Sequence, residues 1–404
     1  MIPPREIKTE EYNYDLPESR IAKFPLNNRD ESKLLFYNKG NISGKIFHEL
    51  PSLLDKNYEL VFNDTKVIQA RLIFEKITGS AIEIFLLEPF EPSDYALSFA
   101  SVNECKWNCL VGNLKKWKSG PLFKKLTVNG NPLTLNATRI QKNDNSFVIQ
   151  FTWDNDSLHF SEIVSHAGLT PIPPYLNREA QEEDVERYQT VYSNYEGSVA
   201  APTAGLHFTE NLLKKIHASG IKTHNLTLHV GAGTFIPVKE EDARKHIMHT
   251  EQIFLNRDTI EKLYYSDKKF LPVGTTSVRT LESLYWTGVK LIYKKPIERG
   301  LFLDQWEVYN YPGSLSRKES MLKILEYLDK QKLSILHLPT RIMIVPGYDF
   351  KMTDGIITNF HQPKSTLLLL IAAYTENDWK RIYNYALENS FRFLSYGDSS
   401  LLLK

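Results

Sequence analysis

The sequence has few cysteines, no long apolar run and almost no net charge. Its 404 residues include two cysteines, and 49 Lys and Arg nearly balance 48 Asp and Glu. The longest uninterrupted apolar run covers residues 367–373, far short of the ~20 residues that a membrane-spanning helix needs. These absences exclude a disulfide-stabilised mini-protein, an apolar membrane-spanning helix and a uniformly basic nucleic-acid-binding protein. The length predicts about two or three domains.

The two cysteines, Cys105 and Cys109, stand four positions apart. On one strand their Cα atoms would lie ~13 Å apart, whereas a disulfide requires less than ~7 Å. We therefore expect two reduced thiols. Because no apolar signal segment occurs near the N-terminus either, we expect a cytoplasmic protein without a membrane anchor. A monomer is the default expectation for its oligomeric state.

The periodicity of apolar residues, and with it the expected secondary structure, changes twice along the chain. Residues 67–155 read as short strands separated by turn residues such as Asn129-Gly130, which favours a small antiparallel β-barrel or a sandwich. Residues 1–66 and 156–404 alternate helical and strand periods, which is typical of an α/β domain. A capping box, Ser316-x-x-Glu319, predicts a helix within residues 285–340. The predicted fold is an α/β domain interrupted by an inserted antiparallel β-barrel domain.

Four predicted strands of the α/β part end in loops rich in small and polar residues. In open α/β sheets, ligands bind beyond the carboxyl ends of the strands. His207 and His361 lie in two of these loops, and either could be a binding group or a surface hydrogen-bonding group. His229 shares one strand face with Asn225 and Thr227. These polar side chains could form a hydrogen-bonded network within the protein, or they could face the substrate. The sequence favours neither alternative over the other.

Three further patterns allow two interpretations each. His246-x-x-His249-x-Glu251 could bind a metal, although it is not the H-E-x-x-H signature. Arg279-x-x-Glu282 is typical of an ion pair on a helix, or of a contact with a carboxylate or phosphate. The sequence KKWK, residues 115–118, could contact RNA and stack a base, or form a solvated hairpin end.

Several long motifs resemble one known family. They include LVFNDTKVIQARL (60–72), GLTPIPPYLNR (168–178), AAPTAGLHFT (200–209), TLHVGAGTFIPV (227–238), VGTTSVRTLES (273–283) and TNFHQPKSTLLLL (358–370). In this order they resemble the S-adenosylmethionine:tRNA ribosyltransferase-isomerases of queuosine biosynthesis, over residues 12 to 398.

The resemblance implies a fold, an activity and a partner. It implies the same α/β fold with an inserted β-barrel, and S-adenosylmethionine as a ribosyl donor with no metal. The acceptor would be 7-aminomethyl-7-deazaguanine at the wobble position of a tRNA with a GUN-type anticodon. The products would be epoxyqueuosine-tRNA, adenine and methionine.

The reaction proposed for this family needs a base beside the sulfonium carbon and a group that assists the departure of adenine. Histidine suits both tasks because its pKa lies near working pH. On the matching positions, the predicted acid/base residues are His207 and His229, followed by His249 and His361. The predicted substrate contacts are Asn63, Arg71, Thr203, Gly231, Gly233, Thr234, Thr275, Thr276, Arg279, Glu282, Asn359 and Ser365.

The sequence also departs from the family pattern. Lys66 stands where an Arg is usual, Gln362 replaces a Leu, and a segment near residues 285–340 is longer than usual. These differences leave open an RNA-binding paralogue that is not catalytic or that uses another acceptor. A metal-dependent hydrolase built on His246, His249 and Glu251 is the other alternative.

Overall fold

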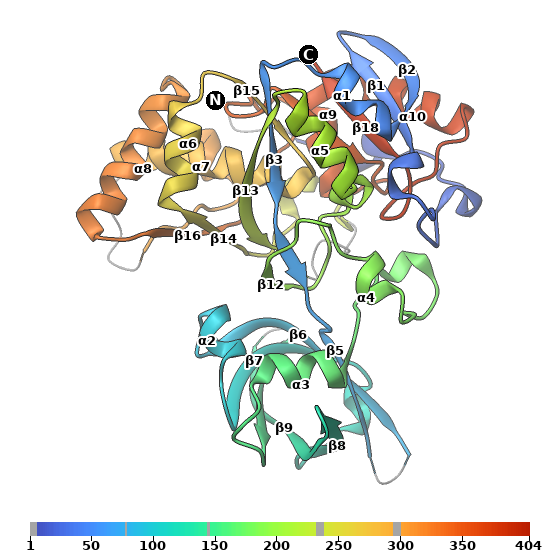
Figure 1. The fold of residues 1–404 in the computed structure, drawn as a ribbon, viewed down its shortest axis with the longest axis vertical. Helices are drawn as coiled ribbons and strands as arrows, with labels where there is room; N and C mark the ends of the chain where they lie inside the picture. The colour runs from blue at the N-terminus through green and yellow to red at the C-terminus, as the bar shows by residue number, and fades with distance from the viewer. Residues whose placement is uncertain (1–5, 77–78, 144–145, 232–237, 294–299) are drawn as a thin grey trace.

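The computed structural model describes residues 6–76, 79–143, 146–231, 238–293 and 300–404. A mixed α/β part, which contains both chain ends, lies above a smaller curled sheet in Figure 1. The curled sheet is inserted in the chain between β4 (Thr65–Val67) and β12 (Tyr195–Ser198), which pair in parallel. The two parts are therefore joined where these two short strands lie side by side.

The centre of the α/β part is a five-stranded sheet in the order β15-β3-β13-β14-β16. Its strands are β15 (Lys269–Pro272), β3 (Tyr58–Asn63), β13 (Lys222–His229), β14 (Glu251–Asn256) and β16 (Ile335–Thr340). Strand β3 pairs in parallel with both β13 and β15, and every residue of it is buried. Such a continuous buried run is typical of a strand covered on both faces.

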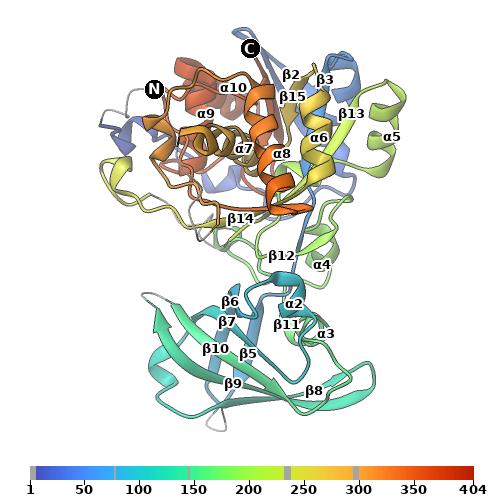
Figure 2. The same ribbon diagram turned by 90° about the vertical axis from the view of Figure 1, so that its left-hand side faces the viewer.

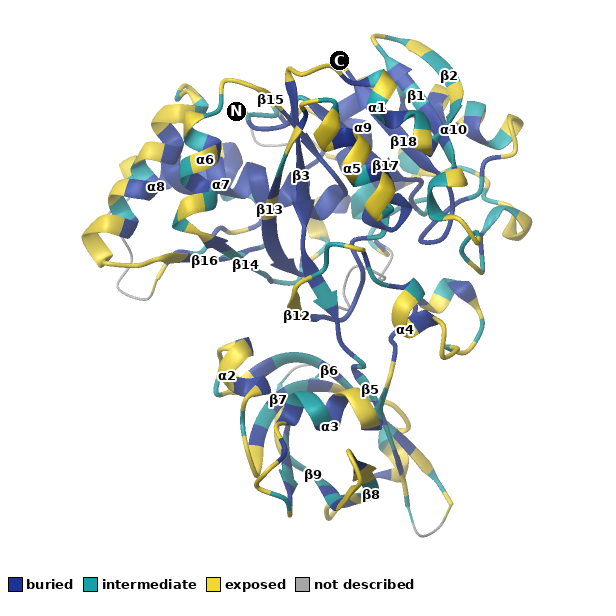
Figure 3. Cartoon of the chain, viewed as in Figure 1, coloured by how far each residue is buried: buried dark blue, intermediate teal, exposed yellow. Residues whose placement is uncertain are grey.

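Helices pack around this sheet. They are α5 (Glu210–Ala218), α6 (Arg257–Tyr265), α7 (Thr275–Tyr293) and α8 (Arg317–Gln331). Helix α7 is buried over residues 275–290, as Figure 3 shows by its colour. The capping box of α8 is present, because Glu319 N–H donates to Ser316 Oγ at 3.2 Å and Ser316 N–H to Glu319 Oε2 at 2.7 Å. The described residues of 285–340 thus contribute the end of α7, all of α8 and strand β16 to the α/β part.

A second sheet of the α/β part joins the two ends of the chain. Its order is β17-β18-β1-β2, with β17 (Gly355–Asn359), β18 (Ser399–Leu403), β1 (Lys33–Asn38) and β2 (Asn41–Ile46). Strands β1 and β18 pair in parallel. The remaining helices of the α/β part are α1 (Leu50–Leu53), α4 (Asp184–Arg187), α9 (Thr366–Thr375) and α10 (Trp379–Glu388).

The inserted part is a seven-stranded sheet in the order β11-β5-β6-β7-β10-β9-β8, antiparallel throughout. Its strands are β5 (Arg71–Glu75), β6 (Ala81–Glu91), β7 (Glu104–Val111), β8 (Leu122–Val128), β9 (Asn131–Asn143), β10 (Ser146–Trp153) and β11 (Gly168–Leu169). Helix α2 (Tyr95–Phe99) follows β6. The sheet curls strongly when seen from the side in Figure 2.

The sequence predicted a small antiparallel β-barrel here, and the structure shows a curled seven-stranded antiparallel half-barrel. No ladder between β8 and β5 occurs among the residues that the structure describes, although the Lys124 Nζ reaches Ile73 O at 2.9 Å. Helix α3 (Phe160–Ala167) fills the concave side, where Phe160 and Ile163 join the apolar core of the sheet. Helix α3 therefore covers the interior of the curled sheet, and the apolar side chains there are buried without pairing between β8 and β5. The predicted domain boundary near residue 155 stays a prediction.

The two cysteines are free and buried on β7, as expected from their spacing. Burial raises the pKa of both thiols above the ordinary value, so they remain protonated and unreactive. None of the helices in the described part of the chain is both long and apolar enough to cross a membrane.

Candidate functional site

Two cavities meet at Val230, just after the end of β13. The larger, of about 1020 Å³, lies between the curled sheet and the α/β part; His229 and His249 line one side and Arg71 the other. The smaller, of about 80 Å³, lies among the strand ends and helix N-termini of the α/β part. Val230 lines both cavities. One elongated ligand could therefore extend from one cavity into the other.

His229 presents an unprotonated ring nitrogen to the larger cavity. Its Nδ1 lies 2.9 Å from Thr65 Oγ1, and Thr65 donates its hydroxyl hydrogen to Ser198 Oγ at 2.9 Å. The Thr65 oxygen is thus free to accept from the His229 Nδ1–H. This assigns the lone pair to Nε2, which has no partner among the described residues. Burial lowers the pKa of His229 to about 4, so the ring is neutral near pH 7.

Two contacts fix the plane of this imidazole. The Tyr95 ring packs against one side at a centroid distance of 4.4 Å. Gly197, with φ +152°, lies so close that an added Cβ would stand 2.6–2.8 Å from three ring atoms of His229. Real Cβ atoms essentially never approach so closely, so the absence of a side chain at residue 197 makes room for the ring.

We expect Gly197→Ala to displace His229 and to lower turnover at least about 10-fold. The effect comes from a misplaced imidazole, because small displacements of a reacting group are costly. Steady-state kinetics together with thermal unfolding measure it. Gly130→Ala, in an open turn with nothing within 4 Å of the added Cβ, is the matched control. Full activity of Gly197→Ala would contradict the assignment of the ring position.

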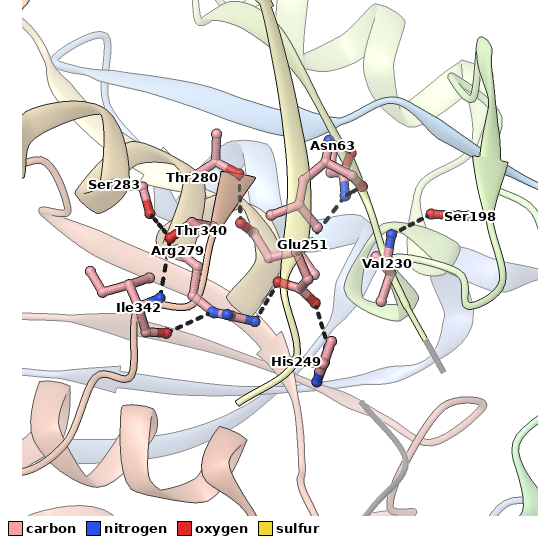
Figure 4. A network of polar contacts seen from close by, with 12 residues as sticks. Asn63, Ser198, Val230, His249, Glu251, Arg279, Thr280, Ser283, Thr340 and Ile342 are labelled. Carbon is pink, nitrogen blue, oxygen red and sulfur yellow. Dashed lines mark hydrogen bonds and ion pairs between the residues drawn. The ribbon is translucent and has the colours of Figure 1, made fainter. Parts of the chain in front are cut away.

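A buried chain of charges supports His249 (Figure 4). The His249 Nε2 lies 3.3 Å from Glu251 Oε1, and the other carboxylate oxygen of Glu251 accepts from the Arg279 Nη1. Burial alone would raise the pKa of Glu251, but the Arg279 guanidinium and His249 outweigh it and hold the pKa below its ordinary value. The carboxylate therefore stays ionised, and its contact with His249 holds that ring at the cavity wall.

His207 is held differently. Ser32 Oγ lies 2.7 Å from its Nδ1 and Asn359 Oδ1 lies 3.1 Å from its Nε2. The Asn359 amide donates to Leu394 O, which orients its oxygen toward the ring. Burial lowers the pKa of His207 to about 4. Both nitrogens are used within the protein, and His207 does not line either of the two cavities.

His361 lines the smaller cavity. Its Nε2 lies 3.0 Å from Thr358 Oγ1, and burial lowers its pKa to about 3. The structure thus separates the four predicted histidines. His229 and His249 face the larger cavity and His361 the smaller one, whereas His207 borders a third recess of only about 20 Å³, with both ring nitrogens hydrogen-bonded. Their catalytic roles stay predictions.

The predicted substrate contacts divide in the same way. Arg71 and Gly231 line the larger cavity, and Arg71 is paired with Glu83 at 2.7 Å. Gly233 and Thr234 lie outside the described residues. Those that line the smaller cavity are Thr203, Thr275, Thr276, Asn359 and Ser365.

Three predicted contacts are buried in the α/β part and line neither cavity. Asn63 bonds the backbone of Leu228, with Nδ2 2.9 Å from the carbonyl and Oδ1 3.0 Å from the N–H. Arg279 pairs with Glu251 rather than with Glu282. Glu282 accepts four hydrogen bonds from the loop that contains Tyr348 and residues 351–353, and burial raises its pKa. Asn63 and Glu282 thus fasten the loops and strands that carry the site.

Sequence reasoning missed several residues of the larger cavity, because they come from separate segments: the inserted part, the proline-rich loop, strand β14 and the residue after β16. They are Glu88, Tyr95, Arg178, Gln252 and Arg341. The motif GLTPIPPYLNR was the one available signal, since its Pro171–Pro174 segment and Arg178 line the cavity. In the KKWK sequence, Trp117 is buried and donates to Gly120 O at 2.8 Å, so it is not available to stack a base.

The side chains that could bind a metal lie apart from one another. Within the described ranges, no group of three or more His, Cys, Asp or Glu side chains is placed to hold a metal ion. His246 lies 3.6 Å from Glu240, whereas His249 contacts Glu251. The two histidines of the HIMHTE sequence thus have different carboxylate partners.

Comparison with known proteins gives a consistent result. The model of the family described as "Queuosine biosynthesis protein" matches residues 9–402. The S-adenosylmethionine:tRNA ribosyltransferase-isomerase of Halothermothrix orenii is 37% identical over 404 aligned residues, covering 98% of this chain and 100% of its own. That of Treponema denticola is 35% identical over 402, covering 98% and 99%.

A solved structure that aligns with this chain is that of S-adenosylmethionine tRNA ribosyltransferase from Thermotoga maritima, which is 26% identical in sequence. The alignment covers 97% of this chain and 100% of the Thermotoga maritima chain, with a TM-score of 0.47. The full-length match to the family model and to the relatives decides the assignment. The chain therefore belongs to the queuosine biosynthesis protein family and is an enzyme of the S-adenosylmethionine:tRNA ribosyltransferase-isomerase type.

Proposed function

We propose that this enzyme transfers and isomerises the ribosyl moiety of S-adenosylmethionine onto 7-aminomethyl-7-deazaguanine in tRNA. The acceptor base stands at the wobble position of a GUN-type anticodon, and the products are epoxyqueuosine-tRNA, adenine and methionine. The observation that carries the proposal is the 1020 Å³ cavity, which His229 at the end of β13 and His249 in the loop before β14 line together with residues of the inserted sheet. The 37% identity to a ribosyltransferase-isomerase over the full chain supports the same reaction.

His229 is the base in this proposal. The first step removes a proton from the carbon beside the sulfonium, and a neutral imidazole with a free lone pair can accept it. The Nε2 of His229 meets this requirement, because Thr65 engages the Nδ1–H. When Nε2 takes the proton, the imidazolium keeps its hydrogen bond to Thr65.

His249 assists the departure of adenine. A leaving adenine needs a hydrogen-bond donor or an acid at a ring nitrogen. Glu251 holds the His249 ring in place, because its carboxylate is fixed by the ion pair with Arg279. The carboxylate acts through the imidazole and does not itself reach the cavity.

In this proposal, the methionine end of S-adenosylmethionine binds in the smaller cavity. Helix α7 starts there at Thr275, and the first N–H groups of a helix attract a carboxylate. The Thr275 and Thr276 side chains line the same space. Because Val230 borders both cavities, the methionine end and the reacting ribose can occupy adjacent sites at once.

One assay tests this function. The protein is incubated with S-adenosylmethionine and tRNA carrying the aminomethyl base, and free adenine is measured by chromatography. Adenine that appears only with this tRNA is the expected result. If a relative is active in parallel and this protein releases none, the proposed function is wrong. Binding of tRNA without consumption of S-adenosylmethionine would identify a non-catalytic paralogue.

A further inference from the structure

The charges of the inserted sheet are distributed very unevenly. Residues 105–143 contain eight of the chain's 49 Lys and Arg and none of its 48 Asp and Glu. The rest of the chain therefore carries 41 basic against 48 acidic side chains. A nearly neutral protein thus has a local excess of positive charge in 39 consecutive residues, which form most of β7, all of β8 and β9, and their connections.

Most of these cations are exposed and unpaired. Lys115, Lys116, Lys118, Lys125 and Lys142 are all exposed, and none of them forms an ion pair with a described residue. Lys106 differs, because Glu91 neutralises it. Because no acidic side chain lies in the same 39 residues, five unpaired ammonium groups give this segment a positive potential that attracts an anionic partner.

The loop that presents the lysines is held in a fixed shape. The buried Trp117 anchors it, and the Arg139 guanidinium lies over the Trp117 ring at 4.9 Å while Nη2 donates to Lys118 O at 2.8 Å. Lys118, Arg139 and Lys142 border a surface recess of about 410 Å³ together with the polar side chains of Thr138 and Gln141. A cationic recess with fixed donors suits a phosphate group.

The recess is connected to the wall of the larger cavity. Asn143, which follows Lys142 on β9, donates to Asn108 Oδ1 at 3.2 Å, and Asn108 donates to Glu88 Oε1 at 3.3 Å. Glu88 lines the larger cavity. A single polar chain therefore runs across the sheet from the cavity to the basic residues, and strands β8 and β9 continue to the far end of the molecule in Figures 1 and 2.

From this arrangement we infer that Lys115, Lys116, Lys118, Lys125, Arg139 and Lys142 form a docking surface for the RNA sugar-phosphate backbone. We call these six residues the basic surface. It holds the helical stem of a tRNA while the stem's loop reaches the larger cavity. Phosphate contacts position a nucleic acid without reading its sequence, so this surface supplies affinity and the cavity supplies selection. The inference rests on the proposed function, since that function makes tRNA the substrate.

The test compares two variants with the same loss of charge. The first carries Lys115→Ala, Lys116→Ala, Lys118→Ala and Lys142→Ala. The second, the control, carries Lys214→Ala, Lys215→Ala, Lys222→Ala and Lys330→Ala, all exposed positions of the α/β part. Binding of a tRNA transcript with a GUN anticodon is measured by filter binding over a range of NaCl concentrations. Binding of S-adenosylmethionine is measured without RNA.

We expect the first variant to bind the transcript at least about 10-fold more weakly and the control to bind like the parent protein. The slope of log Kd against log salt should fall by roughly 0.7–0.9 for each phosphate that the variant no longer neutralises. S-adenosylmethionine binding should not change in either variant. Unchanged transcript affinity and salt slope in the first variant would overturn the inference.

Two further comparisons show what kind of molecule binds the basic surface. If vesicles of phosphatidylcholine and phosphatidylserine bind the basic surface more tightly than the transcript does, the surface serves a membrane and the inference is wrong. The binding assay does not depend on turnover. Loss of RNA binding in the first variant alone, with no adenine formed by the parent protein, would refute the proposed function and leave the docking surface intact.

Discussion

Replacing His229 by Ala is expected to lower the rate of adenine release at least about 100-fold, the usual scale for a lost general base. The physical reason is the loss of the Nε2 lone pair that the Thr65 contact keeps directed into the cavity. The rate is measured under single-turnover conditions with saturating S-adenosylmethionine, so that product release does not mask the chemical step.

Two further variants separate chemistry from folding. In His229→Asn the side-chain amide keeps a donor for Thr65 but provides no base, so we expect the same loss with little change in thermal stability. His217→Ala removes an exposed histidine of α5, whose ring contacts Thr223 at 3.0 Å, and should remain fully active. A His229→Ala rate within about threefold of the parent protein would remove His229 from the mechanism.

Replacing Glu251 by Ala is expected to destabilise the fold by about 3–5 kcal/mol. Glu251 and Arg279 are only 1% and 6% exposed at their side chains, so the variant leaves a guanidinium buried without a counter-charge. Arg279 Nη2 already lacks a partner within the described chain, and its Nε reaches Ile342 O at 3.3 Å. Urea unfolding at pH 7 measures the change in the free energy of unfolding.

The matched variants test the cause of this destabilisation. Glu251→Leu combined with Arg279→Met removes both charges, and we expect it to recover most of the loss. Asp267→Ala breaks the exposed ion pair with Lys318, in which the two side chains are 82% and 49% exposed, and should leave the midpoint unchanged. If Glu251→Ala unfolds at the same urea concentration as the parent protein, the buried pair does not hold the site together.

Local patterns in the sequence were sufficient for much of the fold. The capping box at Ser316 and Glu319 predicted the start of α8, and alternating apolar residues with Asn-Gly turns predicted the antiparallel strands of residues 67–155. These signals depend on neighbours within a few residues. Closure of the inserted sheet depends on distant contacts, and there α3 occupies the space that pairing of β5 with β8 would have closed.

In the site, too, local sequence patterns identify the residues, whereas distant contacts decide how each of them is arranged. His207 and His229 occupy comparable motifs, and no local signal distinguishes them. In the fold, Ser32 and Asn359 arrive from distant segments and engage both nitrogens of His207, whereas Thr65 engages one nitrogen of His229. The spacing in the HIMHTE sequence allows Glu251 as a metal ligand, whereas the structure places its carboxylate between His249 and Arg279.

The sequence by itself determined the family, the α/β character of most of the chain, the reduced state of the cysteines and the motifs that supply the histidines. These properties follow from residue identity and short-range periodicity. Only the tertiary structure decided which histidines face a cavity, which carboxylate supports His249 and which cations, Lys118, Arg139 and Lys142, border one recess. Those properties depend on long-range contacts, because burial and hydrogen-bond partners come from segments that are far apart in the chain.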